Sequence, residues 1–361
     1  MLNSDVSVIG AGPVGSYTSF NLAKAGFKVN LFDQKSIIGK PIQCTGLVSK
    51  NILDFVKPDK ETIQTEIDGA RIYSSDNSLF EVKKSKVAFV LDRDKFDNQL
   101  FQQAISQGVK PFLNHKLELI ANNALKFNKT SATSRYIVGA DGPLSQTAKL
   151  SNLFKGRKFL HGLQTITNLK DKDENFVELY FGKGFPDFFG WIVPQGNKLY
   201  KIGIATKSNP KIHFNNFLKR LKVKQKGLQA GLIPIYNSKV KTQLNNIYLV
   251  GDAACQVKPT TGGGLITGFN CSNALTNSIK YGLNYDKEWR RKVGKELLIH
   301  SLIRKTLNHF DDKDYNSFIK DLNKSKSEIQ NFGDMDYPSK FILKILFKNP
   351  SLLKYLTKIL F

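Results

Sequence analysis

Apolar residues near the start of the chain switch from strand-like to helix-like spacing and back. A short apolar run at Asp5–Ile9 predicts a buried strand, and helical spacing follows at Ser16–Ala25. A second apolar run at Lys28–Phe32 predicts another strand. Two short strands joined by a helix of this length predict a parallel β-α-β unit.

Farther along, four segments are strand candidates, and one of them, around Phe176–Phe181, alternates apolar and polar residues. This run of strand candidates predicts an antiparallel sheet that would form one wall of a binding cavity. The segments are His161–Thr167, Phe176–Phe181, Phe188–Val193 and Lys198–Ala205. Another apolar strand is predicted at Ile247–Val250, and helical spacing prevails from about Asp286 onward.

The order of these elements predicts a mixed α/β fold in three parts. We expect a discontinuous first domain made of residues 1–150 and 246–285, with a sheet domain, 151–245, inserted into it. Residues 286–361 are expected to form a helical C-terminal region.

The last segment, Tyr337–Phe361, is basic and amphipathic. It contains no acidic residue, and its lysines recur with helical spacing on both sides of Pro350. Two interpretations stay open: helices lying on an anionic membrane surface, or a helical cap packed on the core with its lysines in water. The lysines are Lys340, Lys344, Lys348, Lys354 and Lys358.

The charge composition bears on which partners the protein could bind. The 361 residues include 54 Lys+Arg against 30 Asp+Glu, for a formal charge of +24. This charge favours anionic partners, although a general bias toward lysine explains it equally well. Nucleic acid is not expected, because no zinc-finger spacing or RNP-like motif is present.

Cysteine usage and hydropathy indicate a compartment. Cys44, Cys255 and Cys271 have no CxxC spacing, which fits a reduced intracellular protein better than a disulfide framework or a metal site. A signal peptide and a transmembrane span are not expected. We therefore expect a cytoplasmic protein, with peripheral contact to the inner face of the cell membrane as an open possibility.

The first predicted turn carries a dinucleotide motif. Gly10, Gly12 and Gly15 follow the first strand with Gly-x-Gly-x-x-Gly spacing, and Asp33 ends the second strand. The glycines permit a tight turn, close approach of a pyrophosphate and helix–strand packing, and the acid suits ribose hydroxyls. This context predicts a Rossmann-like nucleotide site.

A second glycine-rich stretch lies near the other end of the chain. Gly251 and Asp252 follow a predicted strand, and the loop Gly262–Gly264 then opens a helix. Backbone N–H groups at such a helix start attract phosphate. Two such signals in one chain favour FAD over a simple NAD site.

Two further turns carry candidate polar groups. Asp141, after the strand at Ile137, is a candidate contact for the cofactor or for an incoming nicotinamide, although alone it is an ordinary turn. Asp92 is expected to cap the next helix, and Arg93 could reach a phosphate. Asp94 and Asp97 are expected to be solvated acids of the first turn.

Taken together, these motifs resemble the p-hydroxybenzoate hydroxylase-like flavoproteins, and more narrowly the geranylgeranyl reductase family. The narrower resemblance rests on Pro41–Ser49, Pro259–Gly264 and the aromatic and proline motif of Phe189–Pro194. Val193 and Cys255 depart from the family pattern, which often has an aromatic residue and a glycine there.

The resemblance implies non-covalent FAD and a set of binding residues. Thr261 would join the glycines beside the isoalloxazine ring. The substrate cavity would be lined by Gly46, Leu47, Trp191 and Pro194. The implied cofactor-binding residues are Gly10, Gly12, Pro13, Gly15, Asp33, Gln43, Cys44, Arg93, Asp141, Gly251, Asp252, Gly262, Gly263 and Gly264.

Several of these residues also have simpler interpretations. Cys44 could be an inert buried residue, a cavity residue or a catalytic acid. Trp191 could be an ordinary core residue. The histidines His161, His213 and His300 lack metal spacing and are interpreted as structural or surface residues.

The function implied is FAD-dependent reduction of isoprenoid C=C bonds, such as the geranylgeranyl chains of membrane lipids or their precursors. The reductant would be external, NAD(P)H or a donor protein such as ferredoxin, because no second nicotinamide unit is visible. The proton could come from the flavin, Cys44 or water. The alternatives are an FAD-dependent aromatic monooxygenase and a membrane-surface flavin electron-transfer protein.

Overall fold

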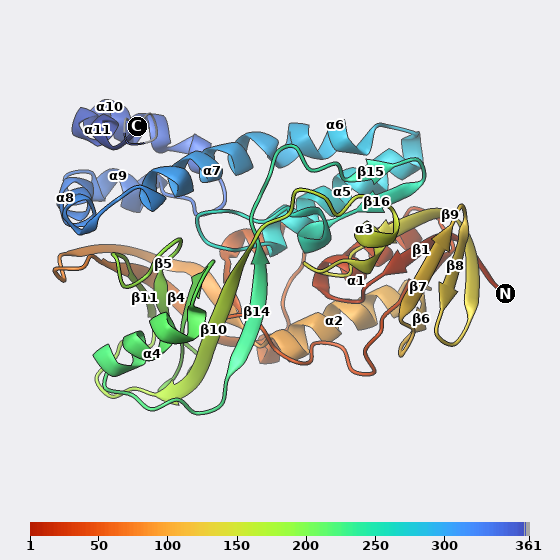
Figure 1. Ribbon diagram of the computed structural model, residues 1–361, viewed down its shortest axis with the longest axis horizontal. Helices are drawn as coiled ribbons and strands as arrows, with labels where there is room; N and C mark the ends of the chain where they lie inside the picture. The colour runs from red at the N-terminus through yellow and green to blue at the C-terminus, as the bar shows by residue number, and fades with distance from the viewer. Residues whose placement is uncertain (357, 359–361) are drawn as a thin grey trace.

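The computed structural model describes residues 1–356 and residue 358, and Figure 1 shows two β-sheets beside each other with helices above them. The first sheet has the strand order β15-β16-β9-β1-β2-β6, with β8 paired to β9 and β7 to β8. Its central strands are parallel. The bounds are β1 Leu2–Ile9, β2 Val29–Phe32, β6 Lys110–Phe112, β7 Leu117–Ala121, β8 Ala124–Phe127, β9 Ser131–Gly139, β15 Gln243–Leu244 and β16 Ile247–Leu249.

The predicted β-α-β unit is confirmed. Its helix, α1 (Pro13–Lys24), begins before the predicted Ser16 because Pro13 occupies its first turn, where the fixed φ of proline suits a helix. Two helices distant in sequence, α2 (Arg93–Ser106) and α5 (Leu265–Tyr281), pack against α1. Apolar residues of β1, β2 and α5 form the core between this helical layer and the sheet.

The second sheet has the order β14-β10-β13-β12-β11-β4-β5-β3, and all its pairs are antiparallel except β11 with β4. The bounds are β3 Leu47–Ser49, β4 Ile63–Tyr73, β5 Leu79–Leu91, β10 Phe159–Asn168, β11 Phe176–Tyr180, β12 Gly190–Pro194, β13 Leu199–Thr206 and β14 Gln229–Pro234.

Three strands of this sheet come from the part of the chain that the sequence assigns to the first domain. Strands β3, β4 and β5 lie within residues 47–91, whereas the predicted sheet domain spans 151–245. The reason is a long-range pairing: Phe176–Tyr180 runs parallel to Gly69–Tyr73. No local pattern reveals such a partner. The division into domains stays a prediction.

Both faces of the second sheet are apolar, and each forms its own hydrophobic cluster. Helix α4 (Pro210–Arg220) packs on one face, over Tyr200, Ile202 and Ile204. The opposite face carries a buried cluster that we call the apolar wall. It consists of Ile67, Ala88, Val90, Leu160, Val177, Phe188, Phe189, Trp191, Val193 and Ala205.

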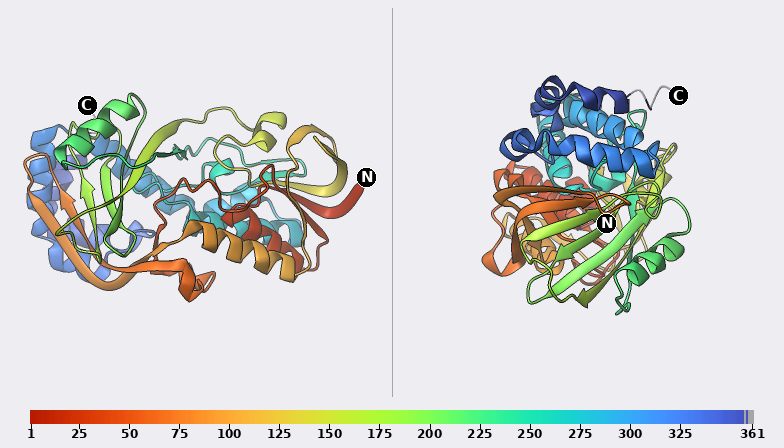
Figure 2. Two further views of the ribbon diagram at one scale, coloured as in Figure 1. Left: turned by 90° about the horizontal axis from the view of Figure 1, so that it is seen from below. Right: turned by 90° about the vertical axis from the view of Figure 1, so that its left-hand side faces the viewer.

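The C-terminal part is helical, as predicted, and runs above both sheets (Figures 1 and 2). Among the described residues, no helix has both the length and the apolar character needed to cross a membrane. The remaining helices are α3 Gln146–Leu150, α6 Tyr285–Trp289, α7 Lys295–Asn308, α8 Asp312–Asn323, α9 Lys326–Phe332, α10 Ile342–Lys348 and α11 Leu353–Leu356, with a π-helical turn at Arg290–Gly294.

The basic C-terminal segment shows features of both open interpretations. Ile345, Leu352 and Tyr355 pack on α7 and α8 in a buried cluster, as a helical cap would. Leu343 and Phe347, one turn apart on α10, are 73% and 90% exposed. The end of this segment, residue 357 and residues 359–361, lies outside the described part.

Candidate functional site

The three glycines of the first turn have the different environments that a dinucleotide motif requires. Gly10 has φ +101°, and a Cβ added there would lie 2.4 Å from the Ala140 carbonyl oxygen. At Gly15 a Cβ would lie 1.8 Å from the Gly10 carbonyl oxygen. At Gly12, by contrast, a Cβ would meet no atom of the described residues within 4 Å. Gly10 and Gly15 therefore permit close packing, whereas Gly12 leaves open space.

Asp33 lies at the same turn. Its carboxylate accepts hydrogen bonds from the backbone N–H groups of Ala11 (2.7 Å) and Lys35 (2.8 Å). Among the described residues no side chain caps the start of α1, where Pro13 lies, so its first-turn N–H groups face the turn without a side-chain acceptor from that part of the chain. Open space, free donors and a nearby carboxylate fit the phosphate and ribose of a dinucleotide.

The second glycine stretch meets the first one in space. Gly251 has φ +68°, and a Cβ there would lie 3.1 Å from Val14 of α1. Gly268 in α5 packs on the same side chain, with 2.6 Å from an added Cβ to Val14. A hydrogen bond of 2.9 Å between Thr18 and Ser272 also joins the two helices. The fold thus brings together the two motifs that lie near opposite ends of the chain.

Asp252 lies at this meeting point with its carboxylate unpartnered. No group in the described part of the chain donates a hydrogen bond to it, and an added Cβ at Gly264 would lie 2.9 Å from its Oδ1. Burial raises the pKa of Asp252 to about 6, although the charge of Arg93 counteracts this rise. A partly buried acid without a donor fits a ligand hydroxyl. The residues present therefore fit FAD.

The Arg93 side chain is already paired within the protein, which the sequence did not reveal. Its Nε and Nη2 donate to the two carboxylate oxygens of Asp97, at 2.7 and 2.8 Å. Burial lowers the pKa of Arg93, but Asp97 and the nearby Cys44 thiol outweigh this and raise it overall. The expectation that Asp97 is solvated is wrong: Asp97 is buried, and its carboxylate is paired with the Arg93 guanidinium. Asp92 caps α2, as predicted, through the Asp94 N–H.

The Cys44 loop packs against the second sheet. The Gly46 N–H donates to the Cys44 Sγ at 3.4 Å, and an added Cβ at Gly46 would lie 2.2 Å from the Leu91 carbonyl oxygen. Leu47 begins β3 and packs against the apolar wall. Gln43 is exposed, and its backbone and Cβ pack on Gly231. The loop thus places Cys44 beside Arg93.

Sequence reasoning missed Lys201, which anchors this loop. It is 3% exposed, and its Nζ donates to the carbonyls of Cys44 (3.0 Å) and Thr45 (3.2 Å). Burial lowers the pKa of Lys201 to about 8. Among the described residues no carboxylate forms a salt bridge with it. A lysine in an otherwise apolar strand was the available signal, because a buried cation is costly without a local purpose.

Trp191 and Pro194 lie in β12, and both are buried. The Trp191 indole donates to the Gln164 Oε1 at 3.3 Å and covers Gly203, where an added Cβ would lie 2.5 Å from the ring. Phe189 contacts Trp191 edge to face. Trp191 is thus a packed member of the apolar wall, and its place in a substrate cavity stays a prediction.

Asp141 is occupied by local contacts. Its carboxylate accepts from the Ser145 hydroxyl (2.5 Å) and from the N–H and hydroxyl of Thr147 (2.8 and 3.0 Å). Burial is the main cause that raises the pKa of Asp141. These contacts favour the simpler interpretation, a turn that starts α3, and its contact with the cofactor stays a prediction.

The C-terminal region contributes three buried ionisable residues that the sequence did not reveal as part of the site. Asp336 forms an ion pair with Lys258, close to the glycine loop. His300, interpreted from sequence as structural or surface, is buried and hydrogen-bonds Thr260 through Nδ1 at 2.6 Å. Arg304 donates to the Thr260 carbonyl at 2.8 Å. The loop is therefore held from the C-terminal side.

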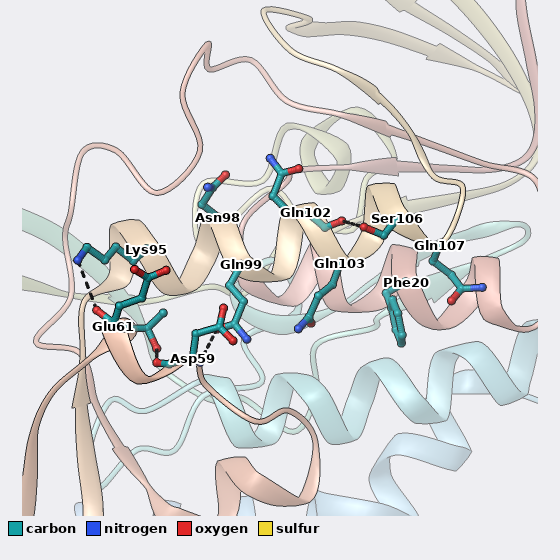
Figure 3. Close-up of a pocket in the computed structure, with 11 residues that line it drawn as sticks. Phe20, Asp59, Glu61, Lys95, Asn98, Gln99, Gln102, Gln103, Ser106 and Gln107 are labelled. Atoms are coloured by element: carbon teal, nitrogen blue, oxygen red, sulfur yellow. Dashed lines mark hydrogen bonds between the residues drawn. The ribbon is translucent and has the colours of Figure 1, made fainter.

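One surface groove lies away from these residues. It has a volume of about 590 Å³ and runs along the outer side of α2, as Figure 3 shows. It contains none of the predicted site residues. Its lining is mostly amide and charged side chains: Phe20, Asp59, Glu61, Thr62, Lys95, Asn98, Gln99, Gln102, Gln103, Ser106 and Gln107. The candidate site is therefore identified by the glycine turns and carboxylates that the fold brings together, and this groove is not part of it.

Metal chemistry has no support in the described residues. No group of three or more His, Cys, Asp or Glu side chains is placed there to hold a metal ion. The three cysteines are free thiols.

Comparisons with known proteins agree with this geometry. Residues 8–45 match the family described as NAD(P)-binding Rossmann-like domain. The chain is 29% identical to digeranylgeranylglycerophospholipid reductase 3 of Methanosphaera stadtmanae, covering 99% of this chain and 98% of the relative. It is 27% identical to digeranylgeranylglycerophospholipid reductase of Methanococcus vannielii, covering 99% and 98%.

Solved structures show the same fold. A geranylgeranyl bacteriochlorophyll reductase-like protein of Thermoplasma acidophilum superimposes with a TM-score of 0.85 at 22% identity, covering 99% of this chain and 100% of that one. A probable FAD-dependent monooxygenase of Pseudomonas aeruginosa gives 0.68 at 16% identity, covering 88% and 100%. The resemblance to the geranylgeranyl reductase family and the Rossmann-like flavoprotein fold are therefore confirmed.

Proposed function

We propose that this protein is an FAD-dependent oxidoreductase that saturates C=C bonds in the isoprenoid chains of membrane lipids or their precursors. The observation that carries this proposal is the similarity, over nearly the whole length of both chains, to proteins named digeranylgeranylglycerophospholipid reductase. The motif set and the open, partner-free groups at Gly12 and Asp252 support it.

Different residues would bind different parts of FAD. The turn of Gly10, Gly12 and Gly15 and the start of α1 would hold the pyrophosphate, and Asp33 the adenosine ribose. Asp252 would accept a hydrogen bond from the ribityl chain. The Gly262–Gly264 loop would lie against the ring system. Bound FAD, once reduced, supplies hydride equivalents that no side chain can supply.

The apolar wall would exclude water and orient the lipid. An isolated alkene is not polarised, so its reduction depends on placing one carbon for hydride and the other for a proton. Trp191 and Pro194 would shape the lipid side of the site. Cys44 is a candidate proton donor, because it lies beside Arg93 and its segment leads into Leu47, which packs against the apolar wall. The electrons would come from an external donor, NAD(P)H or a donor protein.

Anaerobic reduction of a lipid tests this function. Protein reconstituted with FAD, reduced with dithionite and mixed with geranylgeranyl lipids should yield products about two hydrogens heavier per bond in the mass spectrum. A Gly12→Val protein, which blocks the space above the turn, is the matched control. Unchanged lipid mass with FAD-loaded wild-type protein would contradict the proposal.

An aromatic monooxygenase is the second candidate, because the fold is shared with the Pseudomonas protein. Such an enzyme consumes dioxygen during turnover, whereas an alkene reductase works without it. Substrate-dependent oxygen uptake with NADPH, and no lipid saturation under nitrogen, would favour this candidate.

We further propose that α10 contacts an anionic membrane surface at the inner face of the cell membrane. Leu343 and Phe347 would insert among the lipids, and Lys344 would lie beside the phosphates. Salt bridges hold several neighbouring lysines, such as Lys340 to Asp334 and Lys348 to Glu328, so the exposed apolar pair would supply much of the affinity.

Two point substitutions test this contact without disturbing the packed face. Leu343→Ser with Phe347→Ser should reduce sedimentation with phosphatidylglycerol vesicles at low salt by about tenfold. Leu244→Ser, on an exposed leucine of β15, is the control and should sediment like wild type. Equal sedimentation of all three proteins would refute the contact.

A further inference from the structure

Asp336 lies beyond both sheets in the sequence, yet its side chain is almost completely buried, with 1% exposed. One carboxylate oxygen pairs with the Lys258 ammonium. The other accepts from the Ser49 hydroxyl and from the Asn51 amide, the latter at 2.8 Å. A single carboxylate thus joins the C-terminal region to two segments that are distant from each other in sequence.

The first of these segments is the glycine loop. The Lys258 N–H donates to the Gly263 carbonyl at 3.1 Å, and the Lys258 carbonyl accepts from the Gly262 N–H at 2.9 Å. The Lys258 side chain then passes beside Gly263, where an added Cβ would lie 3.0 Å from Cε. Lys258 therefore fixes the position of the loop backbone, and its ammonium group pairs with Asp336.

The second segment is the one that carries Cys44. Ser49 is the last residue of β3, which starts at Leu47 directly after the Cys44–Gly46 turn. Asn51 follows in the short 3-10 helix. Hydrogen bonds to Asp336 therefore hold the far end of this segment at a set distance from the glycine loop.

Burying this ion pair is not expected to add much to the folding stability of the protein. Removing two charges from water costs several kcal/mol per ion, and an apolar pair of similar volume is often as stable. Burial tends to raise the pKa of Asp336, but Lys258, Ser49 and Asn51 outweigh this and lower it overall. The carboxylate is thus held in its charged form, in which it orients three groups at once.

We propose that Asp336 is a positioning residue of the cofactor site, setting the spacing between the Gly262–Gly264 loop and the Cys44 segment. This inference rests on the proposed use of FAD at that site. It makes the C-terminal region part of the flavin-binding apparatus, in addition to any role at a membrane. Asp336 acts through Lys258, Ser49 and Asn51 and need not touch the cofactor itself.

The full-length protein with FAD as the probe tests this role. Asp336→Asn should raise the FAD dissociation constant by about tenfold or more, measured by flavin fluorescence in the temperature range where the variant is folded. Asp321→Asn is the matched control, because Asp321 is another buried C-terminal carboxylate paired with a lysine, Lys324, away from the glycine loop. It should lower the melting temperature and leave FAD affinity unchanged.

A double variant separates positioning from stability. Lys258→Met with Asp336→Met removes both charges, so folding stability should recover while FAD affinity stays weak. If Asp336→Asn, or the double variant where the single one does not fold, binds FAD within twofold of wild type, the inference is overturned. Wild-type protein that binds no FAD overturns it too. FAD binding is read without lipid, so failure of lipid reduction leaves this result standing.

Discussion

Gly15→Ala is expected to destabilise the protein by about 3 kcal/mol or more, because the new Cβ would lie 1.8 Å from the Gly10 carbonyl oxygen. The clash is with backbone on both sides, between the start of α1 and the turn, so no side-chain rotation relieves it. Urea unfolding of the FAD-free protein, followed by circular dichroism, measures the loss. A change below about 1 kcal/mol would contradict the close packing described for this turn.

Gly12→Ala is the matched control, with the same substitution three residues earlier. A Cβ there meets no atom in the described part of the chain within 4 Å, so folding stability should stay within about 0.5 kcal/mol of wild type. The added methyl would nevertheless occupy the space proposed for the pyrophosphate. FAD affinity should therefore fall by at least about tenfold, since a gap of this kind permits the backbone approach. Full affinity in this variant would remove the pyrophosphate from this turn.

Lys201 should make the stability of the protein depend on pH in the alkaline range. Its pKa is lowered from 10.5 to about 8 by burial, so between these values the unfolded chain binds a proton that the folded chain does not. Stability from this group is lowest below pH 8 and rises with pH up to about 10.5. The full rise is about 3 kcal/mol, at 1.36 kcal/mol for each pKa unit.

Comparison of variants isolates this effect from other titrations. Wild type and Lys201→Met are unfolded in urea at pH 7 to 10.5, and the difference between their stabilities should change by about 3 kcal/mol over the interval. Lys211→Met, at an exposed position early in α4, should track wild type. A constant difference between wild type and Lys201→Met would show that the Lys201 ammonium is not destabilised by its surroundings.

Local pattern was enough to predict the elements that carry the glycine motifs. The Gly10–Gly15 turn, α1 and the helix that Asp92 caps depend on contacts within a few residues, and each is found close to its expected place. The same reasoning failed at Asp97, which has the spacing of a solvated first-turn acid but is buried by its partner Arg93. Which side of α2 is buried depends on how the helix packs against elements that are distant in sequence.

The amino-acid sequence by itself predicted a phosphate-binding turn and its acid, because both are local patterns within residues Gly10 to Asp33. The tertiary structure decided which distant groups complete that site. β4 enters the second sheet by pairing with β11, and β5 follows through its pairing with β4. Lys201 meets Cys44, and Asp336 meets Lys258, across long stretches of chain. Such contacts arise when separate elements bury a shared surface, and no periodicity along the chain records which surfaces will meet.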